Sequence, residues 1–528
     1  MKSYIKQFFL LWKHLKKRRK RQLILLLFLS LISAVCESIS LASIFPFLNL
    51  IDNYNNPNFI LFNNSFFELS NFSNQNLFNL SIVFFIVAIF ISGLIRILTI
   101  YLSLKLSAVI GNDLSTKIYR NILNLDYEEH IFLDNNKTVV TLTEHLRKTQ
   151  RIIDSLLTVL TSSLIAISIF IFLFVIDSKA LIIILVVFGS SYLLINYFNN
   201  NKIHIISHRI VSKLNLHIKS IRESLIMIRE IKSFNLNDRY QKNHNEIDKS
   251  LRIALANTAF FAQYPRYMLE IVGFISIAII ALVTKSIPNQ NINLLTTLGG
   301  FALACQRVLP ILQLIYAGIV KIKTHKPSLI EVIYILEKRK KSIPNNADID
   351  NESKLVFKNE INFQNVSFSY KNSKTQLLKK INLKIKKGER IGLIGKSGSG
   401  KSTLIYLLLG LLKPTRGKIF IDNFLFDNLK SNKFNNKSHS LISYVPQDIY
   451  IIEGTFLENI AYGSEKKYIN SELVKECAKK AQLSDLIEKF TLKYDYFINE
   501  NGKNLSGGQK QRLGIARALY QKPEILIL

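Results

Sequence analysis

The chain has 528 residues, which is too long for one ordinary domain, and 48% of them are hydrophobic, with a mean hydropathy of +0.19. A formal net charge of +32 could indicate nucleic-acid binding, but the basic residues concentrate beside the ends of apolar runs, as in residues 13–21. This distribution favours a membrane protein and argues against nucleic acid as a partner; attraction of anionic lipid or substrate is the alternative explanation of the charge. The cysteines at 36, 305 and 477 are scattered and predict no disulfide framework.

Several apolar runs are each long enough to cross a hydrocarbon layer about 30 Å thick. We expect six spans, at residues 23–48, 77–100, 155–176, 180–198, 260–284 and 294–322. Residues 52–76 contain no Lys or Arg and many Asn, so they are predicted to form an external loop. Six crossings then leave both termini in the cytoplasm, and the protein is predicted to be a multi-pass protein of the cell membrane.

The polar segments beside the middle spans are predicted to be helical. Between residues 112 and 264 there is no proline, and Gly189 is the sole glycine, so helices can continue past the membrane. Residues 111–151 and 199–252 are therefore expected to form cytoplasmic helical extensions, while 177–179 form a short turn between two spans. Residues 1–322 are predicted to be an all-α transmembrane domain with six helices, and 323–354, with Pro344 and an Asn pair, a linker.

Short strand-like runs alternate with helical stretches from residue 355 onward. Residues 355–359, 361–370, 381–385, 390–395, 418–422 and 441–445 are the strand candidates. This alternation is typical of an α/β domain with a largely parallel core. Residues 355–528 are therefore predicted to be an α/β nucleotide-binding domain, and the whole chain a multi-domain membrane protein.

A phosphate-binding loop follows the strand candidate 390–395 and opens a helix-like stretch. The sequence GKSGSGKST fits the pattern of a P-loop, in which glycines let successive backbone N–H groups converge on one anion at a helix N-terminus. The lysine reaches the β- and γ-phosphates, and the serine after it ligates Mg²⁺. The predicted ATP-binding residues are Gly395, Lys396, Ser397, Gly398, Ser399, Gly400, Lys401, Ser402 and Thr403. ATP and Mg²⁺ are the expected cofactors.

A second anion-binding helix end is predicted far from the first. Residues 504–512 read NLSGGQKQR and precede the helix-like stretch LGIARALY. Ser506, Gly507, Gly508 and Gln509 open this helix. One triphosphate rarely needs two such helix ends within a single domain.

With GKSGSGKST and LSGGQ in one chain, the sequence resembles the ABC transporter family, and with its spans it is similar to an ABC exporter half-transporter. The resemblance implies a head-to-tail dimer in which Ser506 and Gly508 contact the γ-phosphate of ATP held by the P-loop of the other protomer. Gln447, in YVPQD, resembles the family's Q-loop glutamine, with a catalytic role and, beside Ser402, contact with Mg²⁺. Tyr370 matches the aromatic residue that stacks on adenine. A turn-forming glutamine and a strand-end tyrosine are the alternatives.

Other parts of the resemblance concern contacts within such exporters. Residues 126–134 and 234–238 lie where these exporters place their coupling helices, with solvated loop tips as an equal alternative. Glu500 and Gly502 loosely resemble a loop near the membrane-domain contacts. At 525–528 the chain matches the apolar Walker B strand, but the family's Asp, catalytic Glu and later His do not follow. We therefore expect a fragment of a longer protein that does not turn over ATP at a transporter's rate.

The predicted function is ATP-driven export or flipping of an amphiphilic substrate, such as a lipid-linked glycan. Glu37 with Pro46 and Phe47 resembles the first-helix pattern of exporters similar to lipid-linked-oligosaccharide flippases. Glu37 and Arg96 are ionisable groups in otherwise apolar spans, which is a functional hypothesis by default, with a helix contact as the alternative. Export of drugs or peptides, and a non-transporting or degenerate partner subunit, remain as other readings.

Overall fold

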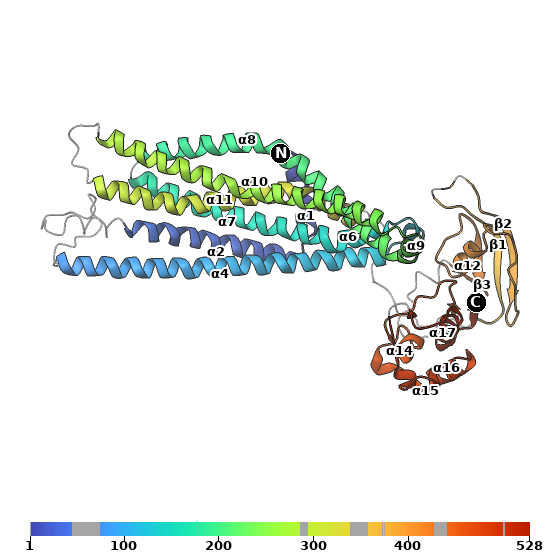
Figure 1. Cartoon of the computed structure of the whole chain (residues 1–528). Coiled ribbons are helices and arrows are strands. Elements are labelled where there is room, and N and C mark those ends of the chain that lie inside the picture. The colour runs from blue at the N-terminus through green and yellow to red at the C-terminus, as the bar shows by residue number, and fades with distance from the viewer. Residues whose placement is uncertain are drawn as a thin grey trace. The chain divides into compact units, whose positions relative to one another are not determined.

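A computed structural model describes residues 2–44, 74–176, 178–285, 294–337, 357–371, 373, 375–426, 441–499 and 502–528. By its internal contacts the chain divides into two units. The first comprises Met1–Asn124 and Leu133–Ser342, and the second comprises Leu125–Phe132 and Ile343–Leu528. The first unit is helical and the second mixes helices and strands (Figure 1).

Long helices make up the first unit, and α2, α4, α7 and α11 run side by side in it (Figure 1). Its helices are α1 (Lys2–His14), α2 (Lys17–Ala42), α4 (Asn74–Leu123), α6 (Asn135–Val140), the π-helical turn η1 (Thr141–His145), α7 (Leu146–Ile176), α8 (Ser178–Ile226), α9 (Ile228–Ser233), α10 (Asn237–Lys285) and α11 (Leu294–Glu337). Helix α4 continues for 50 residues, because no proline interrupts it. The expected extension beyond the apolar span is therefore helical as far as Leu123, and the rest of residues 111–151 is divided into several helices with breaks at 124–126 and 132–134.

Apolar residues at helical spacing hold these helices together. Ile110, Leu114 and Ile118, four residues apart on α4, are buried and belong to one core cluster with Ile152 of α7 and Val332 of α11. Other apolar residues of α4 remain exposed, as expected for a helix that faces lipid. Within the described residues, three helical stretches are long and apolar enough to cross a membrane: Lys17–Ala42, Phe78–Leu123 and Asn135–Val175.

Some expected boundaries differ from the observed ones. Ser178 and Lys179, predicted in a turn, already belong to α8. Helix α11 passes Ile322 and ends at Glu337, so the first part of the expected linker is helical. Pro327 did not stop α11, since a proline inside a helix removes only local backbone hydrogen bonds that packing can offset. The predicted external loop at 52–76 lies almost entirely outside the described residues.

The second unit contains a four-stranded antiparallel sheet, a parallel strand pair and a helical part. The sheet has the order β2 (Leu378–Lys386), β1 (Glu360–Phe368), β3 (Arg416–Ile421), β4 (Phe424–Leu425). Phe363 and Val366 of β1 pack with Ile419 of β3 and with Leu407 of α12 (Lys401–Leu408). This packing fixes α12, the helix that the P-loop opens, against the sheet.

The parallel core is smaller than the sequence predicted. Parallel pairing among the described residues joins β5 (Ile442–Tyr444) to β8 (Ile525–Ile527). Residues 390–395, predicted as the strand before the P-loop, have no strand geometry, and the Ile394 side chain is 98% exposed. Residues 357–359 are also outside any strand. An apolar run becomes a strand only where a neighbouring strand can complete its hydrogen bonds, and no described strand pairs with these residues.

A helical part surrounds the second glycine motif. It contains the short antiparallel pair of β6 (Gly454–Thr455) and β7 (Phe497–Ile498), and the helices α14 (Phe456–Ile460), α15 (Ser471–Lys480), α16 (Ser484–Glu488) and α17 (Gly507–Tyr520). Leu513 and Ala516 of α17 are fully buried and pack with Val474 and Ala478 of α15. The start of α17 is thereby held on a rigid helical base.

Candidate functional site

The P-loop, residues 395–403, has the backbone geometry that an anion-binding loop requires. Gly398 and Gly400 have φ values of 80° and 91°, which favour glycine. Gly400 is also the N-cap of α12, and a Cβ there would lie 2.8 Å from Cδ2 of Leu378. A larger residue at Gly400 would therefore be both strained and crowded. The first N–H groups of α12 form a site for negative charge beside this loop.

Lys401 and its neighbours bring side chains to the same loop. The Lys401 ammonium donates to the carbonyl oxygens of Gly395 at 2.7 Å and Lys396 at 3.0 Å. It is thus held beside the loop by neutral acceptors and can exchange them for phosphate oxygens. Ser402 follows at the second position of α12, and Thr403 is buried.

Tyr370 lies beside this helix, two residues after β1 ends. Its hydroxyl is 3.3 Å from Oγ1 of Thr403, and its ring meets Phe368 edge-on at 4.9 Å between centroids. The structure therefore brings Tyr370 to the P-loop helix, as expected of a residue that contacts a nucleotide bound there. Adenine stacking itself stays a prediction.

Gln447 lies three residues beyond the end of β5, and its side chain is exposed. Ligands of α/β domains bind at the carboxyl ends of parallel strands, which is where Gln447 is placed. Its amide oxygen and the Ser402 hydroxyl are both hard oxygen donors of the kind that Mg²⁺ prefers. This donor set fits the expected metal, and the loop with Lys401 fits a triphosphate.

The second motif begins α17 with a capping box. The Ser506 hydroxyl oxygen accepts from the Gln509 N–H at 3.4 Å, and the Gln509 side chain accepts from the Ser506 N–H at 2.8 Å. The Ser506 hydroxyl hydrogen stays available to donate to an anion. A Cβ added at Gly507 or Gly508 would meet nothing within 4 Å, so this helix end is open. Ser506 and the P-loop belong to different parts of the second unit.

The short helix α5 (Tyr127–Ile131), within the predicted segment 126–134, belongs to the second unit. The Tyr127 ring meets Tyr406 of α12 edge-on at 5.3 Å. Burial and then the Tyr406 hydroxyl raise the pKa of Tyr127 to about 12. The assignment of residues 126–134 to a coupling segment stays a prediction, because the contacts of Tyr127 fit it but no residue of α5 is buried. Phe234, which begins the other predicted coupling segment at 234–238, is 69% exposed. Glu500, in the loop predicted near the membrane-domain contacts, lies outside the described residues.

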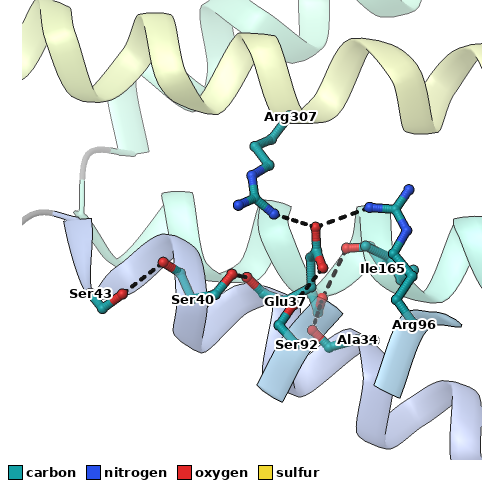
Figure 2. Close-up of polar contacts among 9 residues, drawn as sticks. Ala34, Glu37, Ser40, Ser43, Ser92, Arg96, Ile165 and Arg307 are labelled. Carbon is teal, nitrogen blue, oxygen red and sulfur yellow. Dashed lines mark hydrogen bonds and ion pairs between the residues drawn. The ribbon is translucent and has the colours of Figure 1, made fainter. Parts of the chain in front are cut away.

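A buried ion cluster links three helices of the first unit (Figure 2). The Glu37 side chain of α2 is 2% exposed, and its Oε1 accepts from Arg307 of α11 at 2.6 Å and from Arg96 of α4 at 3.3 Å. Ser92, one turn before Arg96, donates to Oε2 at 2.7 Å. Glu37 and Arg96 were singled out in the sequence, whereas Arg307 and Ser92 were missed. The sequence does hold a signal that could have found Arg307: it is a basic residue inside the predicted apolar span 294–322.

The fold and the sites define a class of protein: a helical membrane unit joined to a P-loop nucleotide-binding unit. Residues 23–298 match the family described as the ABC transporter transmembrane region, and residues 378–528 match the family described as ABC transporter. Since these matches cover most of the chain, it belongs to the ABC transporter family, whose nucleotide-binding domain binds ATP.

Individual relatives match over shorter stretches. An ATP-dependent lipid A-core flippase of Wigglesworthia glossinidia brevipalpis is 43% identical over 169 residues, which are 32% of this chain and 28% of the relative. The lactococcin-G-processing and transport ATP-binding protein of Lactococcus lactis subsp. lactis is 38% identical over 177 residues, 34% of this chain and 24% of the relative. Each match thus spans only about a quarter of the relative's length.

A solved structure shares the fold over almost the whole chain. A bacterial Atm1-family ABC exporter with ATP bound superimposes with a TM-score of 0.71 and 18% identity, covering 96% of this chain and 85% of that one. At this identity the likeness shows the fold alone. It confirms the predicted fold class, a helical transmembrane domain followed by an α/β nucleotide-binding domain.

Proposed function

We propose that this chain is one half of a dimeric ATP-driven exporter that moves an amphiphilic, lipid-tailed anion across the cell membrane, with both termini in the cytoplasm. Membership of the ABC transporter family supports ATP as the energy source of transport. The observation that carries the substrate class is the ion cluster of Glu37, Arg96 and Arg307, because ionised groups inside apolar helices are costly and mark functional sites.

The charge of this cluster favours an anionic headgroup. One carboxylate faces two guanidinium groups, so the cluster carries a net positive charge. The Arg96 and Arg307 side chains are 34% and 32% exposed, while Glu37 is buried. The arginines therefore can reach a ligand while Glu37 holds them in place. A phosphate or diphosphate on a lipid tail would pair with them through bidentate hydrogen bonds.

ATP would be bound and used between two protomers. Lys401 would neutralise the phosphates, and Ser402 and Gln447 would hold Mg²⁺, which spreads the charge of the transferred phosphoryl group. Ser506 and Gly508 of the other protomer would donate to the γ-phosphate, because the open end of α17 offers a hydroxyl and backbone N–H groups. ATP would thus close the dimer, and hydrolysis would release it.

Reconstituted transport tests the substrate class. In proteoliposomes with ATP, we expect the chain, joined to the Asp, Glu and His that the family places after its Walker B strand, to translocate a polyprenyl diphosphate-linked disaccharide, and we expect loss of this transport in Arg307→Gln. Arg266→Gln is the matched control, because Arg266 makes an exposed ion pair with Glu270 in the same unit. Equal transport by Arg307→Gln and the control would reject the role of the cluster. Transport of a cationic drug or a peptide, but not of the lipid, would replace the proposed substrate by one of the alternatives.

The reading of a non-transporting or degenerate partner subunit has a separate test. The intact helix end at Ser506 and the complete P-loop favour a competent subunit. Purified alone, the protein should then form a homodimer that binds ATP in both sites. Two bound nucleotides per dimer, measured by calorimetry, are the expected result, and one or none would favour the degenerate reading.

A further inference from the structure

Helix α5 makes direct contact with the chain on both sides of Tyr370. Oε1 of Glu128 accepts a hydrogen bond of 2.8 Å from the backbone N–H of Lys371, the residue after Tyr370. The Phe132 ring, one residue past α5, meets the Tyr370 ring edge-on at 6.2 Å and 85°. Both contacts lie within the second unit, to which Leu125–Phe132 belongs.

Tyr370 is thereby restrained at its ring, its hydroxyl and its backbone. Phe368 and Phe132 meet the ring edge-on, Thr403 lies within hydrogen-bond distance of the hydroxyl, and Glu128 holds the next peptide group. Two rings that lie nearly perpendicular to Tyr370 fix the direction of its ring plane, and a ring so fixed can stack on a planar base with a smaller loss of rotational freedom. Two of these four restraints come from a segment more than two hundred residues away in the sequence.

We propose that Glu128 and Phe132 are positioning residues for the adenine site, which hold the ring of Tyr370 ready to stack on the base of ATP. The proposal rests on the assignment of Tyr370 as the adenine-stacking residue. Glu128 acts mainly through its acceptor oxygen on the Lys371 N–H, because its ion pair with the Lys371 ammonium is long, at 3.8 Å, and that lysine side chain is 66% exposed.

The same contacts make α5 respond to the base. Residues 125–132 lie in the chain between α4 and α6. When adenine fixes Tyr370, it also fixes the Lys371 peptide and the Phe132 ring, and so restrains this segment. A bound triphosphate without a base contacts the P-loop but not the Tyr370 ring, so it adds no restraint to this segment. Base recognition and phosphate recognition are therefore separable in this protein.

Equilibrium binding to the full chain in nanodiscs tests the proposal, with EDTA present so that no hydrolysis takes place. The fluorescent analogue mant-ATP measures base plus phosphate binding, and displacement by inorganic tripolyphosphate measures phosphate binding alone. We expect Glu128→Ala and Phe132→Ala each to weaken mant-ATP binding about threefold to tenfold, as the loss of one hydrogen bond or aromatic contact implies. Tripolyphosphate should bind both variants as tightly as it binds the wild-type chain.

Three further variants control for charge and folding. Glu129→Ala removes the neighbouring carboxylate of α5, Lys371→Ala removes the long ion pair, and Glu128→Gln keeps an acceptor for the N–H. All three should bind mant-ATP within about twofold of wild type. A loss of tripolyphosphate binding in Glu128→Ala would indicate a general folding defect and would overturn the proposal, as would wild-type mant-ATP binding by both Glu128→Ala and Phe132→Ala.

The variant Tyr370→Ala tests the adenine site separately from the positioning role of Glu128 and Phe132. Loss of stacking should weaken mant-ATP binding about tenfold or more and leave tripolyphosphate unaffected. If Tyr370→Ala has this effect while Glu128→Ala and Phe132→Ala do not, the adenine site stands and the positioning role fails. If Tyr370→Ala binds mant-ATP normally, the assignment of Tyr370 fails, and the positioning role fails with it.

Discussion

Arg307 donates a hydrogen bond of 2.6 Å to Oε1 of Glu37, and so joins α11 to α2 across 270 positions of sequence. The carboxylate is almost fully buried, while the guanidinium group is about one-third exposed. A buried ion pair loses hydration on both sides, so its net contribution to stability is small, but removal of one partner leaves the other uncompensated. Glu37 carries two such partners, so its removal would leave two guanidinium groups uncompensated.

We expect Glu37→Gln to destabilise the helical unit by about 2 kcal/mol, between the values typical of exposed pairs and of fully buried ones. The amide still accepts a hydrogen bond but no longer balances two positive charges. Thermal unfolding of the protein in detergent measures the effect as a lower apparent melting temperature. Ser92→Ala is the control, since it removes one hydrogen bond to Glu37 and leaves all charges in place.

A double-mutant cycle sharpens this test. Because Arg307→Gln removes one of the uncompensated charges, the pair Glu37→Gln with Arg307→Gln should be less destabilised than the sum of the single variants. Additive losses would mean that the two side chains are not coupled, in conflict with the 2.6 Å contact.

The helices and loops that local chemistry determines were predictable from the sequence. Gly398 and Gly400 of the P-loop, the serine at 506 that opens α17 and the long proline-free helices follow from residue type and spacing, and each has the expected local geometry. The run at residues 390–395 was mispredicted because β-propensity alone cannot supply a neighbouring strand. Arg307 and Glu128 were missed because their partners, Glu37 and Lys371, are far away in the sequence, and only the fold brings them together.

The hydrogen bonds of Asp422 predict that the stability of the second unit depends on pH. Its carboxylate accepts from the backbone N–H groups of Lys358, Asn359 and Glu360 at 2.7–2.9 Å. Burial acts to raise the pKa of Asp422, but these hydrogen bonds outweigh it and hold the pKa below the ordinary value of 3.8. The stabilisation is therefore present above pH 3.8 and is lost as the pH falls through the lowered pKa.

The variant Asp422→Asn isolates this contribution, since asparagine tolerates the positive φ of 52° at this position and can still accept a hydrogen bond. Its apparent melting temperature should lie below that of wild type at pH 7, and the difference should shrink as the pH falls below 3.8. A difference that is independent of pH would contradict a charge-based role.

Thiol labelling tests the predicted topology. In a background without Cys36, Cys305 and Cys477, a cysteine that replaces Asn64 should react with a membrane-impermeant reagent on intact cells. A cysteine that replaces the exposed Lys232 in α9 should react only after the cells are opened. The opposite pattern would reverse the assigned orientation.

Lys401 should matter for phosphate binding more than its neighbour in the same loop does. Lys401→Ala removes the ammonium group that lies over the P-loop carbonyls, and we expect ATP and tripolyphosphate to bind about tenfold to hundredfold more weakly. Lys396 contributes its backbone carbonyl to that contact, so Lys396→Ala is the matched control and should bind both ligands nearly normally. Equal losses in the two variants would point to a general electrostatic effect.

Ser506 should act in closure of the dimer and not in the binding of ATP to its own protomer, because it begins α17 in the helical part, away from the P-loop on α12. Ser506→Arg places a bulky cation at the open helix end, while Ser506→Ala removes the cap at a cost of about 1 kcal/mol. Ser506→Arg should weaken mant-ATP binding only by the γ-phosphate contacts that closure adds, and both variants should keep the binding of mant-ATP to the P-loop of each protomer. The measurement is the rate at which a maleimide labels a cysteine that replaces the exposed Lys503, in a background without the native cysteines. ATP should slow this labelling where the helix end is intact, because closure covers it, and should have no effect in Ser506→Arg. An equal slowing by ATP in Ser506→Arg would show that this helix end takes no part in closure.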